Sequence, residues 1–161
     1  MAETEALLAD ALRRIQRLED EAEIRNLLSS YGLATDGGSV EATAQIFAED
    51  CHIDIDGVAF MEGRDQARGI VSSPLHQEIM PNCAHIMGPF HIKWPKDGND
   101  DTAVATGYAT VYLKEGETVK IWRQSYGRWE LVKRDGRWQV LKRTSRSTGR
   151  DDCQDILLRG L

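Results

Sequence analysis

The sequence predicts an α+β fold in which helices precede a curved antiparallel sheet. Helical periodicity dominates the first third of the chain, polar and apolar residues alternate through much of the rest, and Asp-Gly pairs stand where strands would turn. Because sheets twist and curl, a long antiparallel sheet with helices on one face would form a cone whose concave side holds a core or a ligand. No repeat or linker divides the 161 residues, so we expect a single domain over residues 1–161.

The first expected element is a long helix that ends before a pair of glycines. Apolar residues recur mostly at spacings of three, four and seven from Ile15 to Tyr31, which is the pattern of one helical face. A break near Asp20 would divide this helix. After the glycines, Ser39 can cap a second, short helix over residues 40–47.

The remaining elements are mostly strands. Residues 51–63, "CHIDIDGVAFMEG", alternate in polarity and turn at Asp56-Gly57, which predicts a short hairpin. Residues 63–73 predict a third helix. Four strands should follow between residues 84 and 147, joined at "PKDGND", "KEGE" and "RDGR".

Composition excludes several classes of function. The formal net charge of −6 disfavours a polyanionic partner such as nucleic acid. No apolar run reaches the roughly 18 residues that span a bilayer, and the amino terminus is acidic and amphipathic rather than a signal peptide, so we expect a cytoplasmic protein that binds no membrane. Cys51, Cys83 and Cys153 are odd in number and widely spaced, which argues against disulfides and against a cysteine zinc site.

Asp36 stands at the end of the first helix, in "SSYGLATDGG". Helical phase places it about 120° from Ile24, outside the apolar stripe, which favours a solvated aspartate. A carboxylate at a helix C-terminus is locally unfavourable, however, and Gly37 and Gly38 could redirect it. Tyr31 lies within the apolar stripe, where it could be a core aromatic or a catalytic one.

Two histidines, His85 and His91, begin a predicted strand in "CAHIMGPFHIKW". Their spacing and neighbours resemble neither HExxH nor a zinc-finger pattern, so we expect no metal site. A neutral imidazole beside a carboxylate could act as a base near neutral pH, although His85 could also be a strand-end histidine with a purely structural hydrogen bond.

The last predicted strand contains an arginine that could face inward. Counting by two from Trp138 through Val140 reaches Arg146, provided that no bulge intervenes. An inward arginine could bind a carboxylate or a developing oxyanion. Aromatic residues on the middle strands, among them Tyr108 and Trp122, are more typical of core packing.

Taken together, "EIRNLLSSYGLATDGGSVEATAQIFAEDCHIDIDG", "CAHIMGPFHI" and "YGRWELVKRDGRWQVLKR" resemble SnoaL-like proteins of the nuclear transport factor 2 superfold, over nearly the whole chain. The resemblance implies a cystatin-like cone with a pocket between sheet and helices. It is strongest to the branch of scytalone dehydratase, bile acid 7α-dehydratase and hexachlorocyclohexane dehydrochlorinase.

The resemblance implies a catalytic set of Tyr31, Asp36, His85 and Arg146. Asp36 and His85 match the aspartate and histidine that form the catalytic pair in this branch. The chain departs from the bile acid enzyme because it has no acid on the middle strand, from residue 103 to 114.

These observations lead us to expect a lyase, free of cofactors, that eliminates water or another leaving group from a hydrophobic cyclic small molecule. An isomerase or a polyketide cyclase could use the same base, and a binding module without catalysis is a further alternative. The family implies a homo-oligomer, either a dimer or a trimer. The expected pocket wall comprises Ile53, Phe60, Ile79, Tyr108 and Trp122.

Overall fold

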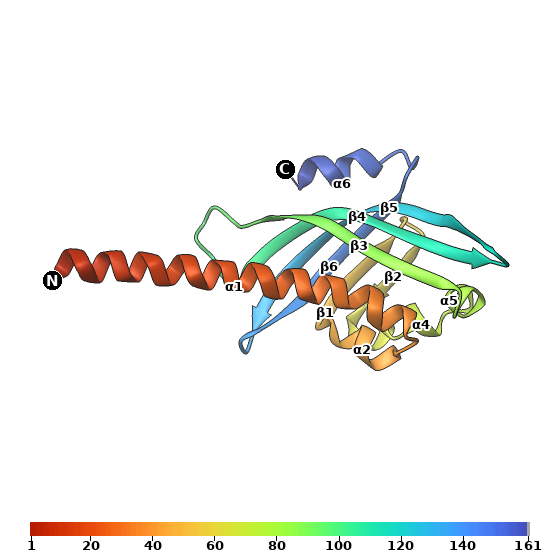
Figure 1. Ribbon diagram of the computed structural model, residues 1–161, viewed down its shortest axis with the longest axis horizontal. Coiled ribbons are helices and arrows are strands. Elements are labelled where there is room, and N and C mark those ends of the chain that lie inside the picture. The colour runs from red at the N-terminus through yellow and green to blue at the C-terminus, as the bar shows by residue number, and fades with distance from the viewer. Residues whose placement is uncertain (161) are drawn as a thin grey trace.

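The computed structural model describes residues 1–160 and begins with one long helix, α1 (Ala2–Asp36) (Figure 1). The helix continues through Asp20 without the expected break. Asp20 is instead buried against the sheet, where it accepts hydrogen bonds from Lys133 Nζ (2.6 Å) and Trp138 Nε1 (3.0 Å). Residues 1–19 extend beyond the sheet and are largely exposed. None of the helices within residues 1–160 has the length and apolarity needed to cross a bilayer.

Along the chain, four short helices follow α1 before residue 83, where the main part of the sheet begins. They are α2 (Val40–Gln45), α3 (Gly63–Ala67), α4 (Gly69–Ser72) and α5 (Pro74–Ile79). The Ser39 hydroxyl caps α2 by accepting the Ala42 N–H at 3.2 Å, as expected. The expected third helix is divided into α3 and α4, and α5, which begins with Pro74, was not expected.

Six strands form one mixed sheet in the order β2-β1-β6-β5-β4-β3. Their bounds are β1 (Phe47–Ile55), β2 (Ala59–Glu62), β3 (Cys83–Lys93), β4 (Thr102–Glu115), β5 (Thr118–Arg134) and β6 (Arg137–Ser147). Neighbours are antiparallel except β1 and β6, which are parallel. The prediction of an antiparallel sheet is therefore wrong at this one pairing. Because β1 and β6 are far apart in the chain and no turn joins them, no local sequence pattern indicated it.

The hairpin turns follow the Asp-Gly pairs. Asp56 and Gly57 have φ of 59° and 67°, and Asp135 and Gly136 have φ of 51° and 72°. Positive φ at both central residues is the requirement of a type I′ turn, whose twist matches that of the flanking strands. The β1–β2 and β5–β6 connections are confirmed at these positions.

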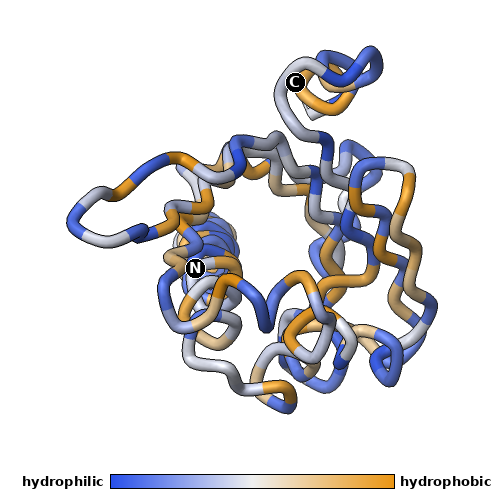
Figure 2. Tube along the Cα trace, turned by 90° about the vertical axis from the view of Figure 1, so that its right-hand side faces the viewer, coloured by the Kyte–Doolittle hydropathy of each residue, from blue (hydrophilic) through white to orange (hydrophobic). Residues whose placement is uncertain are grey.

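The core lies between α1 and the concave face of the sheet. Ile24 and Leu28 of α1 pack with Phe47, Trp129 and Val140, and all five are at most 1% exposed. On the convex face lies α6 (Cys153–Arg159), which contacts β4, β5 and β6 and was not expected from the sequence (Figures 1 and 2). The concave face of the curled sheet, covered by α1, is therefore the side of the molecule on which a ligand site can form.

Candidate active site

A cavity of about 240 Å³ lies between the C-terminal end of α1, the short helices α4 and α5, and the concave face of the sheet. Most of its wall is apolar. Six of the apolar residues are Ile55, Met61, Ile70, Leu75, Met87 and Val111. Polar side chains also line the wall, among them Tyr31, His76, His85, Arg123 and Arg143, and these can orient a ligand.

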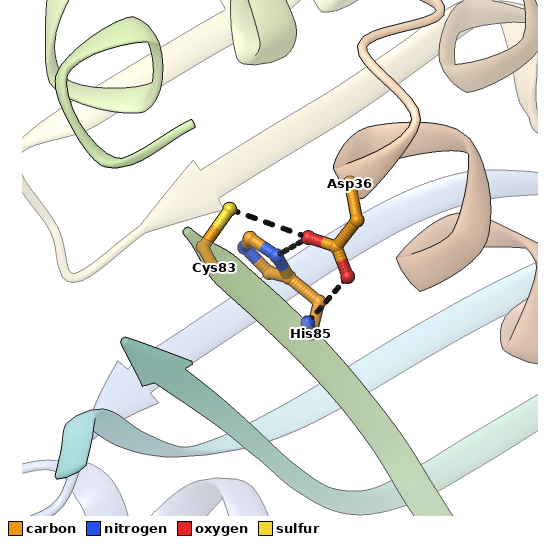
Figure 3. Close-up of side chains that lie close together, drawn as sticks. All are labelled: Asp36, Cys83 and His85. Atoms are coloured by element: carbon orange, nitrogen blue, oxygen red, sulfur yellow. Dashed lines mark hydrogen bonds and ion pairs between the residues drawn. The ribbon is translucent and has the colours of Figure 1, made fainter. Parts of the chain in front are cut away.

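Asp36 and His85 meet at one side of this cavity (Figure 3). His85 Nδ1 lies 2.6 Å from Asp36 Oδ1, and the backbone N–H of His85 donates to Asp36 Oδ2, also at 2.6 Å. Both carboxylate oxygens are therefore engaged by one residue, which fixes the position of the carboxylate and the plane of the ring. The Asp36 side chain is therefore turned toward β3 and only 25% exposed, whereas helical phase suggested a solvated position.

The hydrogen bond to Asp36 decides which ring nitrogen of His85 carries the proton. A carboxylate has no proton to donate, so Nδ1 is the donor and Nε2 keeps its lone pair in the neutral ring. Burial lowers the pKa of His85 below 6.5, an effect that Asp36 opposes and that His76 and Arg143 reinforce. The imidazole is therefore neutral at pH 7 and able to accept a proton.

Glycines bring α1 close enough to β3 for this contact. A Cβ at Gly32 would stand 2.3 Å from the backbone oxygen of His85, so only glycine allows the approach. At the end of the helix, Gly37 remains in the right-handed helical region, and Gly38 takes a φ of 69° that turns the chain away from Asp36.

The Tyr31 ring lies edge-on to the His85 ring, with 6.5 Å between ring centres, and Tyr31 contacts an arginine that the sequence analysis did not select. Arg143 Nη1 donates to the Tyr31 hydroxyl at 2.6 Å, and the guanidinium also lies 4.6 Å from the ring centres of Tyr31 and Trp129. Because the Tyr31 oxygen accepts this hydrogen bond, its own O–H can donate to a bound molecule. Tyr31 and Arg143 both line the cavity.

The position expected for Arg146 is corrected by the structure. Arg146 lies outside the cavity lining, where it binds both oxygens of Asp54 at 2.8 and 2.9 Å and Asp152 at 2.6 Å. The register between β5 and β6 shifts so that Leu131 faces Val140 while Glu130 faces Lys142. The bulge that this creates at Leu141 reverses the alternation, and Arg143 faces inward instead.

Two further ionisable residues of the cavity lining were not predicted from the sequence. Arg123 of β5 donates to Asp56 Oδ2 at 2.9 Å and to the Ser147 hydroxyl at 3.0 Å. His76 of α5 is buried, lies 5.7 Å from His85 between ring centres, and bonds through Nε2 to the Thr35 backbone oxygen at 3.1 Å. The alternation of β5 could have indicated Arg123, whereas His76 belongs to a helix that the sequence did not reveal.

The five expected wall residues divide into two groups. Ile79 and Trp122 line the cavity. Ile53 is a core residue outside the lining, at 2% exposed, while Phe60 and Tyr108 are 64% and 47% exposed. Phe60 and Tyr108 lie on the outer face because the phase of a strand could not be assigned to a face without knowing which side α1 covers. Ile53 lies on the inner face, but in the packed core instead of the cavity wall.

Asp36, Cys83 and His85 are the only cluster of metal-type donors found within residues 1–160, their ligand atoms lying within 4.8 Å of one another. Cys83 Sγ donates to Asp36 Oδ1 at 3.5 Å. Burial, together with the charge of Asp36, raises the pKa of Cys83 to about 11, so the thiol stays protonated at pH 7. A protonated thiol is a poor ligand, and the donors already satisfy one another as a hydrogen-bonded group.

The model of the SnoaL-like domain family matches residues 16–144, which include Tyr31, Asp36, His85 and Arg143. The chain belongs to the SnoaL-like family. The expected family and fold are thereby confirmed. No curated protein matches this SnoaL-like chain.

Solved structures similar to this SnoaL-like chain share its cystatin-like fold. An NTF2-like protein with a cystatin-like fold from Novosphingobium aromaticivorans is 28% identical, with a TM-score of 0.86, over 93% of this chain and 96% of that one. A candidate scytalone dehydratase from the same organism is 19% identical (TM-score 0.69; 81% and 85% covered). The hexachlorocyclohexane dehydrochlorinase LinA-type3 from Novosphingobium barchaimii is 20% identical (TM-score 0.70; 84% and 90% covered).

Proposed function

We propose that this protein is a lyase that eliminates water or another leaving group from a hydrophobic cyclic small molecule, with His85 as general base. The observation that carries the proposal is the hydrogen bond between Asp36 and His85 beside an apolar cavity. The names of two structural neighbours, a candidate scytalone dehydratase and a dehydrochlorinase, support elimination as the reaction class.

In the proposed reaction, Nε2 of His85 removes a proton from a substrate carbon. Asp36 holds the ring in the required tautomer and stabilises the imidazolium that forms. The electron pair of the broken C–H bond becomes the new C=C bond, and the leaving group departs with its own bonding pair. When that group is hydroxide, it leaves as water with a proton from the Tyr31 hydroxyl, and the proton that His85 has taken up then restores the tyrosine.

Tyr31 and Arg143 serve the departing group in this scheme. The Tyr31 O–H donates to the leaving oxygen or to a neighbouring carbonyl, since its own oxygen already accepts from Arg143. The guanidinium stabilises the negative charge that develops there, and its burial strengthens this electrostatic effect. Arg143 thus takes the role that the sequence analysis gave to Arg146.

The proposal is tested by measuring whether candidate substrates lose the mass of one water when the protein is added. Cyclic β-hydroxy ketones and β-hydroxy acids would be incubated with the protein, and mass spectrometry would detect the loss of one water. We expect His85→Ala and Asp36→Asn each to lower turnover by at least about 10²-fold, the usual contribution of a general base.

His91→Ala is the matched control for this test. His91 lies on the same strand, but its ring bonds to the Gly160 backbone oxygen and is not part of the cavity lining. Its turnover should equal that of the wild type. Unchanged turnover in both His85→Ala and Asp36→Asn would contradict the mechanism, and a product of unchanged mass would identify an isomerase or cyclase instead.

We also propose that two copies of the chain associate through residues 1–19, here called the α1 arm. Five apolar residues of the arm are 51–67% exposed, namely Leu7, Leu8, Leu12, Ile15 and Leu18. A helix of this length is marginal without a partner. Its first half is acidic (Glu3, Glu5, Asp10) and its second half is basic (Arg13, Arg14, Arg17), so two antiparallel arms would pair opposite charges around a two-fold axis.

A further inference from the structure

Arg143 is a buried cation without an anionic partner. Its side chain is 5% exposed, and within residues 1–160 it takes part in no ion pair. Its one hydrogen bond in that range goes to the neutral hydroxyl of Tyr31. Nε is buried with no partner at all. Most of the hydrogen-bonding capacity of this guanidinium, which has five N–H donors, is therefore unused.

The surrounding side chains hold this charge in place. The rings of Tyr31 and Trp129 each lie 4.6 Å from the guanidinium carbon. Trp129 is 1% exposed and Tyr31 is 3% exposed, so neither ring can swing aside to let the arginine reach solvent. The positive charge is fixed at the wall of the cavity, where desolvation makes an unpaired ion unfavourable.

No nearby carboxylate within residues 1–160 forms an ion pair with it. Arg123, the second arginine of the lining, is paired with Asp56 at 2.9 Å, and Asp36 is occupied by His85. No aspartate or glutamate is among the described residues that line the cavity. Because His85 is neutral, Asp36 keeps its negative charge, but both of its oxygens bind His85 and Asp36 does not line the cavity. Within residues 1–160, Arg143 is therefore a cation of the wall that no carboxylate contacts.

We propose that the substrate is a small cyclic carboxylate whose carboxylate group binds Arg143. The planar fork of a guanidinium matches a carboxylate, and an anion would supply the missing partner. The volume of about 240 Å³ suits one substituted ring, since a cavity of about 150 Å³ holds benzene. The proposal rests on the proposed function in taking this cavity as the substrate site, and it assigns the Arg143 guanidinium to the substrate carboxylate instead of to the leaving oxygen.

The test compares two ligands that differ in charge and hardly in shape. Benzoate and benzamide would be titrated into the full-length protein at pH 7.5, and Kd would be measured by calorimetry. We expect the wild type to bind benzoate at least about tenfold more tightly than benzamide, as a charge-assisted hydrogen bond would provide. Arg143→Gln should bind the two ligands equally.

Arg134→Gln is the matched control, because it removes the same charge from an exposed ion pair with Asp50 outside the cavity lining. It should keep the full preference for benzoate. Arg143→Lys retains the charge but lacks the fork, and it should keep a reduced preference. Should Arg143→Gln fail to fold, the wild type and Arg143→Lys decide the question.

Equal binding of the two ligands by the wild type, or a preference for benzoate that persists in Arg143→Gln, would overturn the proposal. The result is independent of turnover, since His85→Ala should keep the preference even though it lacks the proposed base. Loss of activity in that variant together with equal binding by the wild type would leave the lyase standing and reject the carboxylate substrate.

Discussion

At the scale of single residues, His85 is subject to opposing electrostatic influences. Burial, His76 and Arg143 disfavour its charged form, whereas Asp36 favours it. The effect of burial is the larger, and the pKa falls below 6.5. The ring is therefore neutral at pH 7, where it can accept a proton, and it does not form a permanent ion pair with Asp36. Catalytic bases need such a match between pKa and working pH.

The pKa of His85 can be measured without a substrate. NMR titration of the ring protons should give a midpoint below 6.5, and a still lower one in Asp36→Asn, because the carboxylate that raises the pKa is gone. Between the folded and unfolded pKa values the unfolded chain binds more protons, so His85 should lower stability as the pH falls below 6.5. A midpoint above 6.5 in the wild type would contradict this account.

At the scale of elements, the alternation of β6 could be predicted only as far as its bulge. The sequence placed Trp138 and Val140 on the inner face, and both are buried. The extra residue at Leu141 then reverses which side chains of β6 face inward, so that Arg143 and not Arg146 lines the cavity. No residue near Leu141 indicates a bulge in the sequence. Pairing between strands, not the strand itself, creates such a feature, so local patterns could not reveal it.

The contact between α1 and β3 depends on the missing side chain at Gly32. Gly32→Ala would place a methyl group 2.3 Å from the His85 backbone oxygen, which must push the helix from the strand. We expect a loss of about 1–3 kcal/mol in the free energy of unfolding, as for other overpacked sites, and a changed NMR midpoint for His85. Chemical denaturation measures the first effect.

Gly69→Ala provides the comparison for this substitution. A Cβ at Gly69, in the first turn of α4, would meet no atom within 4 Å. Its stability should equal or slightly exceed that of the wild type, because alanine reduces the freedom of the unfolded chain. Equal stability of both variants would mean that α1 and β3 are not held as closely as described.

At the scale of the whole molecule, the order of helices and strands was largely predictable, whereas their long-range contacts were not. The Asp-Gly pairs located two of the turns, and the apolar periodicity located α1. The parallel pairing of β1 with β6 and the position of α6 on the convex face depend on contacts across the chain. The family resemblance supplied the meeting of Asp36 with His85, which helical phase alone argued against.

The α1 arm allows a prediction about assembly. A Leu8→Glu, Leu12→Glu double variant should change a dimer into a monomer, because it places charge within the apolar stripe of the arm. Light scattering after size-exclusion chromatography measures the mass. Ala6→Glu lies about 160° around the helix from Leu8 and should leave the dimer intact. A trimer, or a mass that none of the variants changes, would contradict pairing through the arm.

The single unpaired charge of Arg143 stands inside a molecule of net charge −6, and the two act on an anion at different times. An approaching carboxylate meets the repulsion of the whole surface first, which slows its association at low ionic strength. Salt screens this outer field over a Debye length of about 8 Å at physiological strength but hardly reaches a buried contact. A molecule built in this way selects its ligand by how long it stays bound, not by how fast it is captured.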